Sequence, residues 1–366
     1  MNGRSQASRG TDRLTAPDQI NSMAKTYRNL FEQIANFENL HAAYLLARRG
    51  KRYSADALQF GSRLEENLLC LRNELRSGDF RTGEYRTFTV YEPKQRLVAA
   101  LPFRDRVVHH ALCRVIEPIW ETRFIHDSYA CRVGKGTHTG ADRVTEFLRR
   151  ARGIWDQVYV LKMDVRSYFP SIDHGVLLSL VSRRVACPRT MRLITGIIYS
   201  WSPGGRATGL PIGNLTSQLF ANVYLHELDK FVKHTLQIRF YVRYMDDAVI
   251  IHGDKRQLHE IKDQIAGFLK DKLKLRLNSK TSVFPAAQGV NFLGYRIWWS
   301  HRLLRKRSVT QMRRKLRRFE REYTAGQIGL NEIDASVQSW LGHAGHANTY
   351  RLREKLFEGF VLTLDR

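Results

Sequence analysis

One stretch decides the fold, Ile238-Arg239-Phe240-Tyr241-Val242-Arg243-Tyr244-Met245-Asp246-Asp247-Ala248-Val249-Ile250-Ile251. Its two apolar runs, Ile238 to Val242 and Ala248 to Ile251, are rich in β-branched and aromatic residues, which predicts the two strands of a hairpin. Two adjacent carboxylates, Asp246 and Asp247, then fall at the turn. Neighbouring like charges repel each other unless a cation compensates them, so the pair indicates a divalent-metal site. An ordinary Asp-rich turn is the alternative, because Asp is a common turn residue.

The composition is that of a globular and strongly basic chain. Its 366 residues are 43% hydrophobic, which is enough for two or three subdomains around a sizeable core. The formal net charge of +25 predicts a polyanionic partner, with nucleic acid as the first candidate. The sequence has neither a run of the roughly 20 apolar residues that a spanning helix needs nor a signal peptide. We therefore expect a cytoplasmic protein that does not bind a membrane.

Cysteine and histidine residues give no metal or disulfide pattern. The four cysteines are scattered without a CxxC pair, so we expect them to be buried as small hydrophobic residues: Cys70, Cys113, Cys131 and Cys187. His343 and His346 have a spacing seen in metal sites, but no carboxylate or thiol lies near them in the sequence, whereas a structural site has about four ligands. We assign no metal to them.

The first hundred residues predict helices followed by a β ribbon. Leucines recur at helical spacing from Leu64 to Leu75, before Gly78 ends the run. Two β-type runs, 86–91 and 96–100, then flank Pro93-Lys94-Gln95 and predict a ribbon that carries the cations Lys94 and Arg96. For both cations, a solvated surface position is the alternative to a functional one.

Two further motifs lie between the ribbon and the hairpin. The run 157–164 predicts a strand that ends in Asp164, for which a solvated Asp at a strand end is the alternative reading. The segment 208–218 is a loop with Gly and Pro, followed by an amphipathic helix. Several polar residues stand at the entrance of that helix, where they could simply cap it: Asn214, Thr216, Ser217 and Gln218.

The order of these elements predicts an α+β fold with a mixed sheet and helices on one face. Asp164 and the hairpin carboxylates lie far apart in the sequence but could meet on adjacent strands of such a sheet. Together Asp164, Asp246 and Asp247 would hold two divalent cations, which suits nucleotidyl transfer by two metal ions about 3.5–4 Å apart.

At this point the motifs closely resemble those of reverse transcriptases, in the same order and over nearly the whole chain. The matching segments are Asp164 with Tyr168-Phe169, the loop 209–218, Tyr244-Met245-Asp246-Asp247, Leu277-Asn278-Ser279-Lys280-Thr281 and Phe292-Leu293-Gly294-Tyr295. Within the group II intron and retron-like superfamily, Ile212-Gly213-Asn214-Leu215-Thr216-Ser217-Gln218 resembles the loop of the reverse transcriptases of diversity-generating retroelements.

The resemblance implies a right-hand polymerase fold with four regions. Residues 1–22 would be a disordered basic tail and 23–157 an N-terminal helical region with the fingers. Residues 158–299 would form the palm, with a fingers segment at about 174–207, and 300–366 a helical thumb. A dense basic stretch from Arg302 to Arg321 fits a thumb helix along a phosphate backbone, with a solvated basic face as the alternative.

The resemblance also implies roles for individual residues. Asp164 and Asp246 would bind two Mg²⁺ ions, with Mn²⁺ as the alternative metal, and Asp247 would be more peripheral. Lys94 and Arg96 would offset the charge of the dNTP triphosphate, and Lys280 would donate a proton or neutralise pyrophosphate. Phe169 would exclude a ribose 2′-hydroxyl, although core packing is its rival role. Ile212 and Gln218 would lie near the incoming nucleotide, where an apolar Ile212 weakens discrimination.

The resemblance further implies RNA-directed DNA polymerisation with adenine-biased errors, which would diversify a target gene. The expected partners are template RNA, primer, cDNA, dNTPs and a small basic accessory protein, in a bacterial or phage-encoded system. A retron- or group II intron-type reverse transcriptase is the first alternative, and a catalytically silent RNA-binding scaffold is the second.

Overall fold

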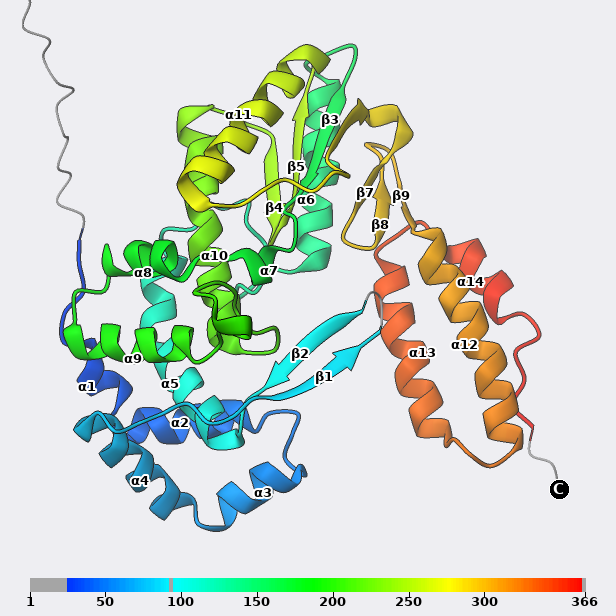
Figure 1. Ribbon diagram of the computed structural model, residues 1–366. Helices are drawn as coiled ribbons and strands as arrows, with labels where there is room; N and C mark the ends of the chain where they lie inside the picture. The colour runs from blue at the N-terminus through cyan, green and yellow to red at the C-terminus, as the bar shows by residue number, and fades with distance from the viewer. Residues whose placement is uncertain (1–24, 92–94, 364–366) are drawn as a thin grey trace, which may run out of the picture.

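The quoted stretch forms the β4–β5 hairpin of a four-stranded sheet in the computed structural model, which describes residues 25–91 and 95–363 (Figure 1). The sheet order is β4-β5-β3-β6, and its strands are β3 at Tyr159–Asp164, β4 at Tyr241–Tyr244, β5 at Asp247–His252 and β6 at Ser282–Pro285. Every pairing in this sheet is antiparallel. The α+β prediction is therefore confirmed, but the mixed sheet is wrong, because strand direction depends on how the long helical connections return the chain.

Both faces of this sheet are covered. Leu161 and Met163 of β3 belong to the main core, together with apolar residues of α10 (Leu215–Lys230) and α11 (Lys255–Leu273). Val160 points to a second core, shared with α6 (Thr137–Arg152) and a small three-stranded sheet. The sheet thus differs from the expected one with helices on one face. Val160, Leu161 and Met163 of β3 are all buried, which is the pattern of a strand that is covered on both sides.

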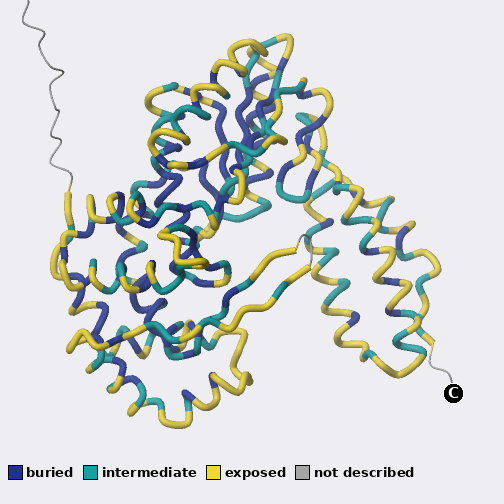
Figure 2. Tube along the Cα trace, viewed as in Figure 1, coloured by how far each residue is buried: buried dark blue, intermediate teal, exposed yellow. Residues whose placement is uncertain are grey.

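A mainly helical region precedes the sheet. Its elements are α1 at Leu30–Ile34, α2 at Phe37–Ala47, α3 at Ala55–Ser62, α4 at Leu64–Ser77, β1 at Arg86–Val90, β2 at Arg96–Ala100 and α5 at Phe103–Glu121. Leu68, Leu71 and Leu75 are buried, and Gly78 ends α4 in the left-handed region, so the predicted helix is confirmed. The antiparallel β1–β2 ribbon projects from the body and is largely exposed (Figures 1 and 2). The predicted tail 1–22 and Lys94 lie outside the described residues.

The remaining helices fall into two groups. Between β3 and β4 lie α7 at Tyr168–Ser171, α8 at His174–Ser182, α9 at Pro188–Tyr199 and α10, which a π-helical turn at Phe231–Thr235 extends. After β6 come β7 at Val290–Phe292, β8 at Tyr295–Ile297, β9 at Arg302–Leu304, α12 at Lys306–Thr324, α13 at Leu330–Gly345 and α14 at Tyr350–Phe357. None of the helices in the described ranges has the length and apolar character of a membrane span.

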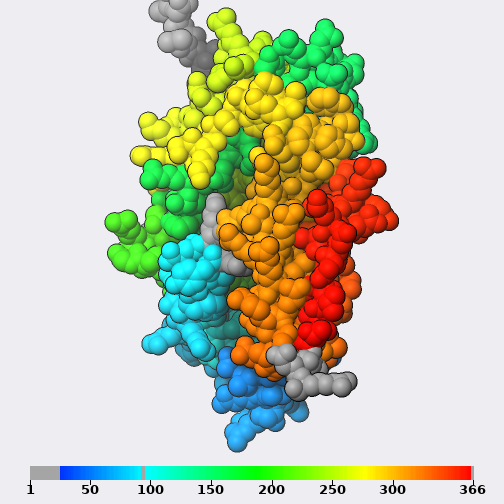
Figure 3. All heavy atoms as spheres, turned by 90° about the vertical axis from the view of Figure 1, so that its right-hand side faces the viewer, coloured from blue at the N-terminus to red at the C-terminus, as the bar shows by residue number. Residues whose placement is uncertain are grey.

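The C-terminal helices have a small core of their own. It consists of Met312, Leu316, Phe319, Ile333 and Leu356. On the face shown in Figure 3, α12 and α13 (orange) and the β1–β2 ribbon (cyan) lie on either side of a hollow. The apolar pattern from Tyr350 to Phe360 predicts helical packing at Tyr350, but this residue is 67% exposed. It stands in the first turn of α14, on the side of the helix away from that core.

The cysteine prediction is half right. Cys113 and Cys187 are buried, whereas Cys70 and Cys131 are exposed, and all four are free thiols. Cys70 lies on the outer side of α4, two residues after the buried Leu68, and Cys131 lies in a loop. Spacing alone could not separate these environments, because a helix has an exposed face as well as a buried one.

A fully buried ion pair joins α10 to the hairpin. The Arg243 and Asp229 side chains are 0% exposed, and Arg243 Nη2 lies 2.5 Å from Asp229 Oδ2. Arg243 Nε also donates to Asp229 Oδ1 at 2.7 Å, and the Tyr241 hydroxyl donates to the same oxygen at 2.9 Å. Burial alone would lower the pKa of Arg243, but Asp229 raises it above its usual value. Arg243 therefore stays charged in the core.

We expect Arg243→Leu to lower the free energy of unfolding by about 3–5 kcal/mol, because it leaves the Asp229 carboxylate buried without its partner. Urea unfolding at pH 7 measures this loss. The double variant Arg243→Leu/Asp229→Leu should recover much of it. The control Arg256→Ala removes an exposed pair with Glu260 and should cost about 0–0.5 kcal/mol. Equal losses in the single and double variants would contradict this account.

Candidate active site

Three carboxylates meet at one end of the central sheet. Asp164 is the last residue of β3 and lies opposite Asp247, the first residue of β5, in the strand register. Asp246 precedes it in the tight turn that joins β4 to β5, and its carbonyl accepts from the Val165 N–H at 3.3 Å. The prediction that Asp164 joins the hairpin pair on adjacent strands is therefore confirmed by the register.

The turn before these carboxylates has an unusual backbone. Met245 adopts φ 54°, a left-handed conformation that a residue with a long side chain rarely takes. Two contacts stabilise it, since the Met245 side chain is buried against the main core and its carbonyl accepts from Arg243 Nη1 at 3.0 Å. The buried ion pair of Arg243 thus reaches directly to the turn that presents Asp246. Strain of this kind persists only where the surrounding structure over-determines it.

Burial and repulsion act together on the two carboxyl groups nearest each other. Burial raises the pKa of Asp246 to about 6, and the neighbouring Asp164 carboxylate adds to the rise. Without a cation, Asp246 therefore keeps its proton up to about pH 6. A divalent ion would relieve the same repulsion, so the donor set of Asp164 and Asp246 fits a metal that prefers oxygen ligands.

Asp247 has a different environment. Its Oδ1 lies 2.5 Å from Lys162 Nζ, and burial raises its pKa while Lys162 opposes that rise. Over residues 25–91 and 95–363, no group of three or more His, Cys, Asp or Glu side chains is arranged to hold a metal ion. The geometry thus supports two carboxylates facing each other, with the third engaged by a lysine. Mg²⁺ sites of this kind commonly use one or two carboxylates and take their other ligands from phosphates and water.

Asn278 holds Asp164 from the other side. Its Nδ2 donates to Asp164 Oδ2 at 3.0 Å, and its backbone N–H donates to the Asp164 carbonyl at 2.7 Å. Asn278 Oδ1 in turn accepts from the backbone N–H of Lys280 at 3.1 Å. Lys280 is thereby placed two residues from a direct partner of Asp164, with its own side chain exposed.

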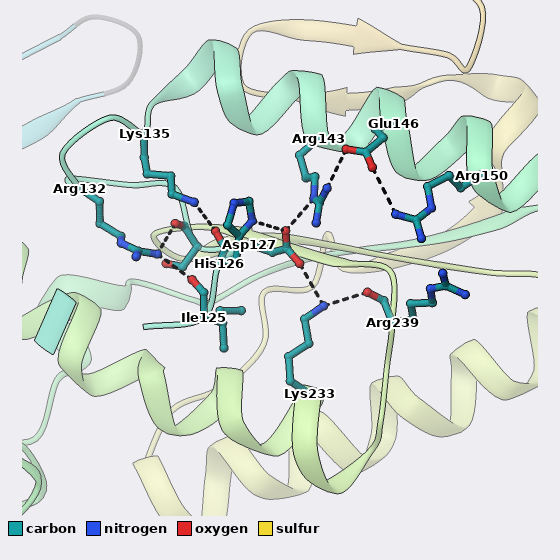
Figure 4. A network of polar contacts seen from close by, with 11 residues as sticks. Ile125, His126, Asp127, Arg132, Lys135, Arg143, Glu146, Arg150, Lys233 and Arg239 are labelled. Carbon is teal, nitrogen blue, oxygen red and sulfur yellow. Dashed lines mark hydrogen bonds and ion pairs between the residues drawn. The ribbon is translucent and has the colours of Figure 1, made fainter. Parts of the chain in front are cut away.

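A second polar network supports the strand that leads to the turn (Figure 4). Asp127 accepts from Arg143 Nε at 2.8 Å and from Lys233 Nζ at 3.2 Å. Burial raises the pKa of Asp127, but these two cations outweigh burial and lower it below its usual value. The backbone beside Asp127 is tied to β4, because its carbonyl accepts from the Arg243 N–H and the Arg243 carbonyl accepts from the Tyr129 N–H, both at 2.9 Å. Helices α6 and α10 are thus connected to β4.

The loop 208–218 lies against the β1–β2 ribbon. The Ile212 carbonyl accepts from the Ala99 N–H of β2 at 2.9 Å. Gly213 has φ +123°, and a Cβ there would lie 3.0 Å from the Ala99 carbonyl oxygen, so this close approach requires glycine. Gln218 lies in the first turn of α10, partly exposed.

The polar residues at the start of α10 do not cap it as the alternative reading supposed. Asn214 occupies the N-cap position but makes no capping hydrogen bond, and its Nδ2 lies 3.3 Å from the Tyr85 hydroxyl. Thr216 is buried and bonds His109 Nδ1 at 2.9 Å. These side chains therefore fasten the helix entrance to the N-terminal region.

The other predicted site residues lie on different elements of the fold. Phe169 is half-buried in α7 and packs on the main core, and its carbonyl accepts from Leu210 N–H at 2.9 Å, which brings the loop 208–218 alongside. Arg96 is exposed on β2 opposite Val90. Lys94 lies outside the described residues.

Lys162 and Asn278 were missed by sequence reasoning. Lys162 stands two residues before Asp164 and thus on the same face of β3, which was the available signal. Asn278 lies inside a motif that had been noticed for Lys280. Arg305, just before α12, also lowers the pKa of Asp247 by its charge and had been counted only within a basic stretch.

Comparisons with known proteins identify the family to which the chain is similar. A family model described as "Reverse transcriptase (RNA-dependent DNA polymerase)" matches residues 91–297. Protein YkfC of Escherichia coli (strain K12) is 32% identical over 292 residues, which cover 68% of this chain and 74% of that protein. The group II intron-encoded protein LtrA of Lactococcus lactis subsp. cremoris is 25% identical over 272 residues, 56% of this chain and 44% of that protein. Thus the match spans less than half of LtrA. Among solved structures, apo telomerase from Candida tropicalis has a TM-score of 0.49 at 12% identity, covering 75% of this chain and 60% of that chain.

We expect Asp246→Asn to raise the free energy of unfolding of the metal-free protein at pH 8 by about 1–2 kcal/mol. Because the native state holds the Asp246 proton more tightly than the unfolded chain does, stability falls as the pH rises from about 4 to about 6 and stays lower above that. Asparagine does not ionise and avoids this loss, so the gain should vanish at pH 3.5.

Thermal unfolding in EDTA and in Mg²⁺ measures this effect. Added Mg²⁺ should raise the melting temperature of the wild type at pH 8 and that of the variant much less. Asp263→Asn, an exposed position on α11, serves as the control. A variant no more stable than the wild type at pH 8 would show that the carboxylate pair is not strained.

Proposed function

We propose, because this chain belongs to the reverse transcriptase (RNA-dependent DNA polymerase) family, that it is the error-prone polymerase of a diversity-generating retroelement. In this role it copies a template RNA into cDNA with frequent errors at template adenines, and the cDNA diversifies a target gene. The facing carboxylates Asp164 and Asp246 at the sheet end are the observation that carries the catalytic part. The loop 212–218 is the feature that favours a diversity-generating retroelement over other reverse transcriptases.

The carboxylates would hold the metal ions of nucleotidyl transfer. Asp164 and Asp246 are the residues that fit Mg²⁺, or Mn²⁺, and the bound metal would supply activation of the primer hydroxyl and stabilisation of the leaving oxygen. Asn278 fixes the orientation of Asp164 by two hydrogen bonds. Lys162 forms an ion pair with Asp247, which would leave Asp247 as the more peripheral carboxylate.

The residues around the carboxylates would bind the nucleotide. Arg96, on the exposed ribbon, would offset triphosphate charge together with Lys94, and Lys280 would neutralise pyrophosphate or donate a proton. Phe169 would lie under the sugar and exclude a 2′-hydroxyl, so that the product is DNA. The half-buried position of Phe169 beside the loop 208–218 supports this role.

The loop would set the fidelity. Ile212 carries an apolar side chain while its backbone is fixed to β2, so it offers no side-chain hydrogen bond to a nucleotide. Discrimination between bases requires contacts that differ in the transition state, and an apolar contact differs little between them. Gln218 lies six residues later in the first turn of α10, where it can line the same loop.

The basic helix α12 would follow the phosphate backbone of the RNA–DNA hybrid. Its exposed face includes Arg313, Arg314, Arg317 and Arg321, while Met312, Leu316 and Phe319 turn inward. Neutralising phosphates with such a face gives salt-dependent and sequence-independent affinity. Template RNA, primer and cDNA would be the partners of this face, and a small basic accessory protein completes the proposed retroelement system.

A group II intron-type reverse transcriptase is the second candidate. The 25% identity with the intron-encoded protein of Lactococcus lactis favours it. The two candidates differ in fidelity, since only the first requires errors concentrated at template adenines.

We expect the wild type to extend a DNA primer on an RNA template with dNTPs and Mg²⁺, and Asp246→Asn to lose at least about 10³-fold in rate, because it removes a charged ligand of the metal. A gel-based primer-extension assay measures this rate. Asp263→Asn should extend at the wild-type rate. Extension by Asp246→Asn at that rate would refute the catalytic assignment, and an inactive wild type would favour the RNA-binding scaffold.

We expect sequenced products of the wild type to carry errors mainly opposite template adenines. Ile212→Gln should lower the error frequency roughly 3- to 10-fold, because the added amide gives a contact that differs between correct and wrong pairs. Ile212→Val, which stays apolar, is the matched control. Errors spread evenly over the four template bases would favour the group II intron-type enzyme, and an unchanged spectrum in Ile212→Gln would remove this residue from the account.

A further inference from the structure

A pocket lined by arginines lies away from the carboxylates. It is formed by α1, α4 with the segment that follows it, and α9, and its volume is about 390 Å³. Figure 1 shows these helices together on the opposite side of the molecule from α12 to α14. Neither the carboxylates nor the loop 208–218 contribute to its lining. The pocket is therefore a site separate from the proposed polymerase centre.

The charge of the pocket is one-sided. Its lining includes Arg76, Arg81, Arg189 and Arg192, and no acidic residue among the described ones. Glu32, just outside, pairs with Arg189 at 2.6 Å and more loosely with Arg76 at 3.7 Å. One carboxylate thus serves two guanidinium groups, and the lining keeps a clear excess of positive charge. An anion is the chemistry that this excess would recognise.

Two of the arginines are held in place from behind. Arg189 stacks on the Phe31 ring with its guanidinium carbon 4.0 Å from the ring centroid, and its Nη2 donates to the Arg76 carbonyl at 2.7 Å. Arg81 Nη1 donates to the Gly78 and Phe80 carbonyls at 2.8 and 2.9 Å, which leaves its other donors for a ligand. Such fixed guanidinium groups lose little freedom on binding a phosphate.

Arg192 is exposed like the other three arginines of the lining, and it differs from them in its partners. Among the described residues its side chain makes no ion pair or hydrogen bond. It reaches toward the end of α4, where a Cβ on Gly78 would come within 4.0 Å of its Nη1. Gly78, in its left-handed conformation, therefore leaves the space beside Arg192 open. The guanidinium of Arg192 is therefore available to bind an anion in the pocket.

Part of the pocket lining is apolar, and we refer to it as the apolar floor. It consists of Phe31, Phe80, Leu75, Leu193 and Ile197. A bare phosphate would need no such floor, whereas a nucleotide combines a phosphate with a flat base that packs on apolar and aromatic groups. The volume falls within the range of about 300–1,000 Å³ that is usual for small-molecule sites. A single nucleotide satisfies both parts of the lining.

From this arrangement we propose that the pocket binds one unpaired nucleotide of a single-stranded RNA segment, with its phosphate on Arg192 and Arg81 and its base on the apolar floor. A base inside a duplex cannot enter such a hollow, so the site selects unpaired RNA. The proposal rests on the proposed function in that an RNA-copying enzyme supplies the RNA partner. It assigns a second RNA contact that anchors the template-bearing RNA far from the carboxylates.

Two variants separate the charge from the shape of the pocket. Arg192→Ala removes the free guanidinium from an exposed position, where folding is not at risk. Gly196→Leu adds a side chain on α9 in the pocket lining, at a point where a Cβ meets nothing within 4 Å, and it keeps every charge. Arg256→Ala and Gly196→Ala are the matched controls, since Arg256 is 90% exposed on α11.

Fluorescence anisotropy with the full chain and a 12-nucleotide single-stranded RNA, in EDTA, measures binding. We expect Arg192→Ala to weaken binding about 10-fold and to reduce the slope of log affinity against log salt by about 0.7, the value for one phosphate contact on a single strand. Gly196→Leu should weaken binding about 5- to 10-fold without changing the slope, as expected for a lost stacking contact. Both controls, and all variants on a blunt RNA duplex of the same sequence, should stay within about twofold of the wild type.

Three results would overturn the proposal. The first is that both variants bind the single strand as tightly as the wild type, and the second is that the variants weaken binding equally on single strand and duplex. The third is that a deca-glutamate peptide displaces the RNA from the wild type but not from Arg192→Ala, which would assign the pocket to an acidic peptide. Because binding in EDTA needs neither metal nor dNTP, a wild type that binds through the pocket but extends no primer contradicts only the proposed function.

Discussion

The buried pair of Arg243 and Asp229 is the constraint on which the rest of the site depends. Removing two charges from water is expensive, and the attraction between them repays this only when the geometry and the remaining hydrogen bonds are good. Both conditions are met here, because the Tyr241 hydroxyl also donates a hydrogen bond to Asp229. Arg243 in turn donates to Asn222 Oδ1 and to the Met245 carbonyl. Any shift of β4 along α10 would break several of these contacts at once. The pair therefore fixes the register of the hairpin, and with it the position of Asp246.

Asp246, which this hairpin presents, destabilises the protein at neutral pH. Asp246 is held close to Asp164 in a partly buried place, which raises its pKa and costs stability at neutral pH. Lys162 and Asn278 reduce the problem by engaging Asp247 and one oxygen of Asp164, respectively. What remains is the repulsion between the Asp164 and Asp246 carboxylates, which a divalent cation would relieve. A buried ion pair that fixes the hairpin, next to two carboxylates that repel each other, is the arrangement expected of a site that stores strain for function.

Much of this fold could be predicted from local pattern, and the errors share one cause. The hairpin and the strand to Asp164 were predictable because β-branched runs and turn residues lie next to each other in the sequence. The coverage of both sheet faces, the antiparallel order and the exposure of Tyr350 depend on packing between distant segments. Lys162 illustrates the point, since its pairing with Asp247 requires the register of β3 against β5, which no local pattern contains.

The polar residues at the entrance of α10 extend this argument from fold to function. Local reasoning offered them as helix caps, yet Asn214 and Thr216 bond to Tyr85 and His109, which lie far away in the sequence. The loop before them is tied to β2 through the Ile212 carbonyl and the Ala99 N–H. Because Ile212, Asn214 and Thr216 are all bonded to the N-terminal region, this part of the loop is held to the ribbon that carries Arg96. Under the proposed function, Ile212 would set fidelity and Arg96 would face the triphosphate, and these two residues would therefore move together. Loose copying would then come from the apolar Ile212 side chain itself, because the backbone that presents it is firmly held.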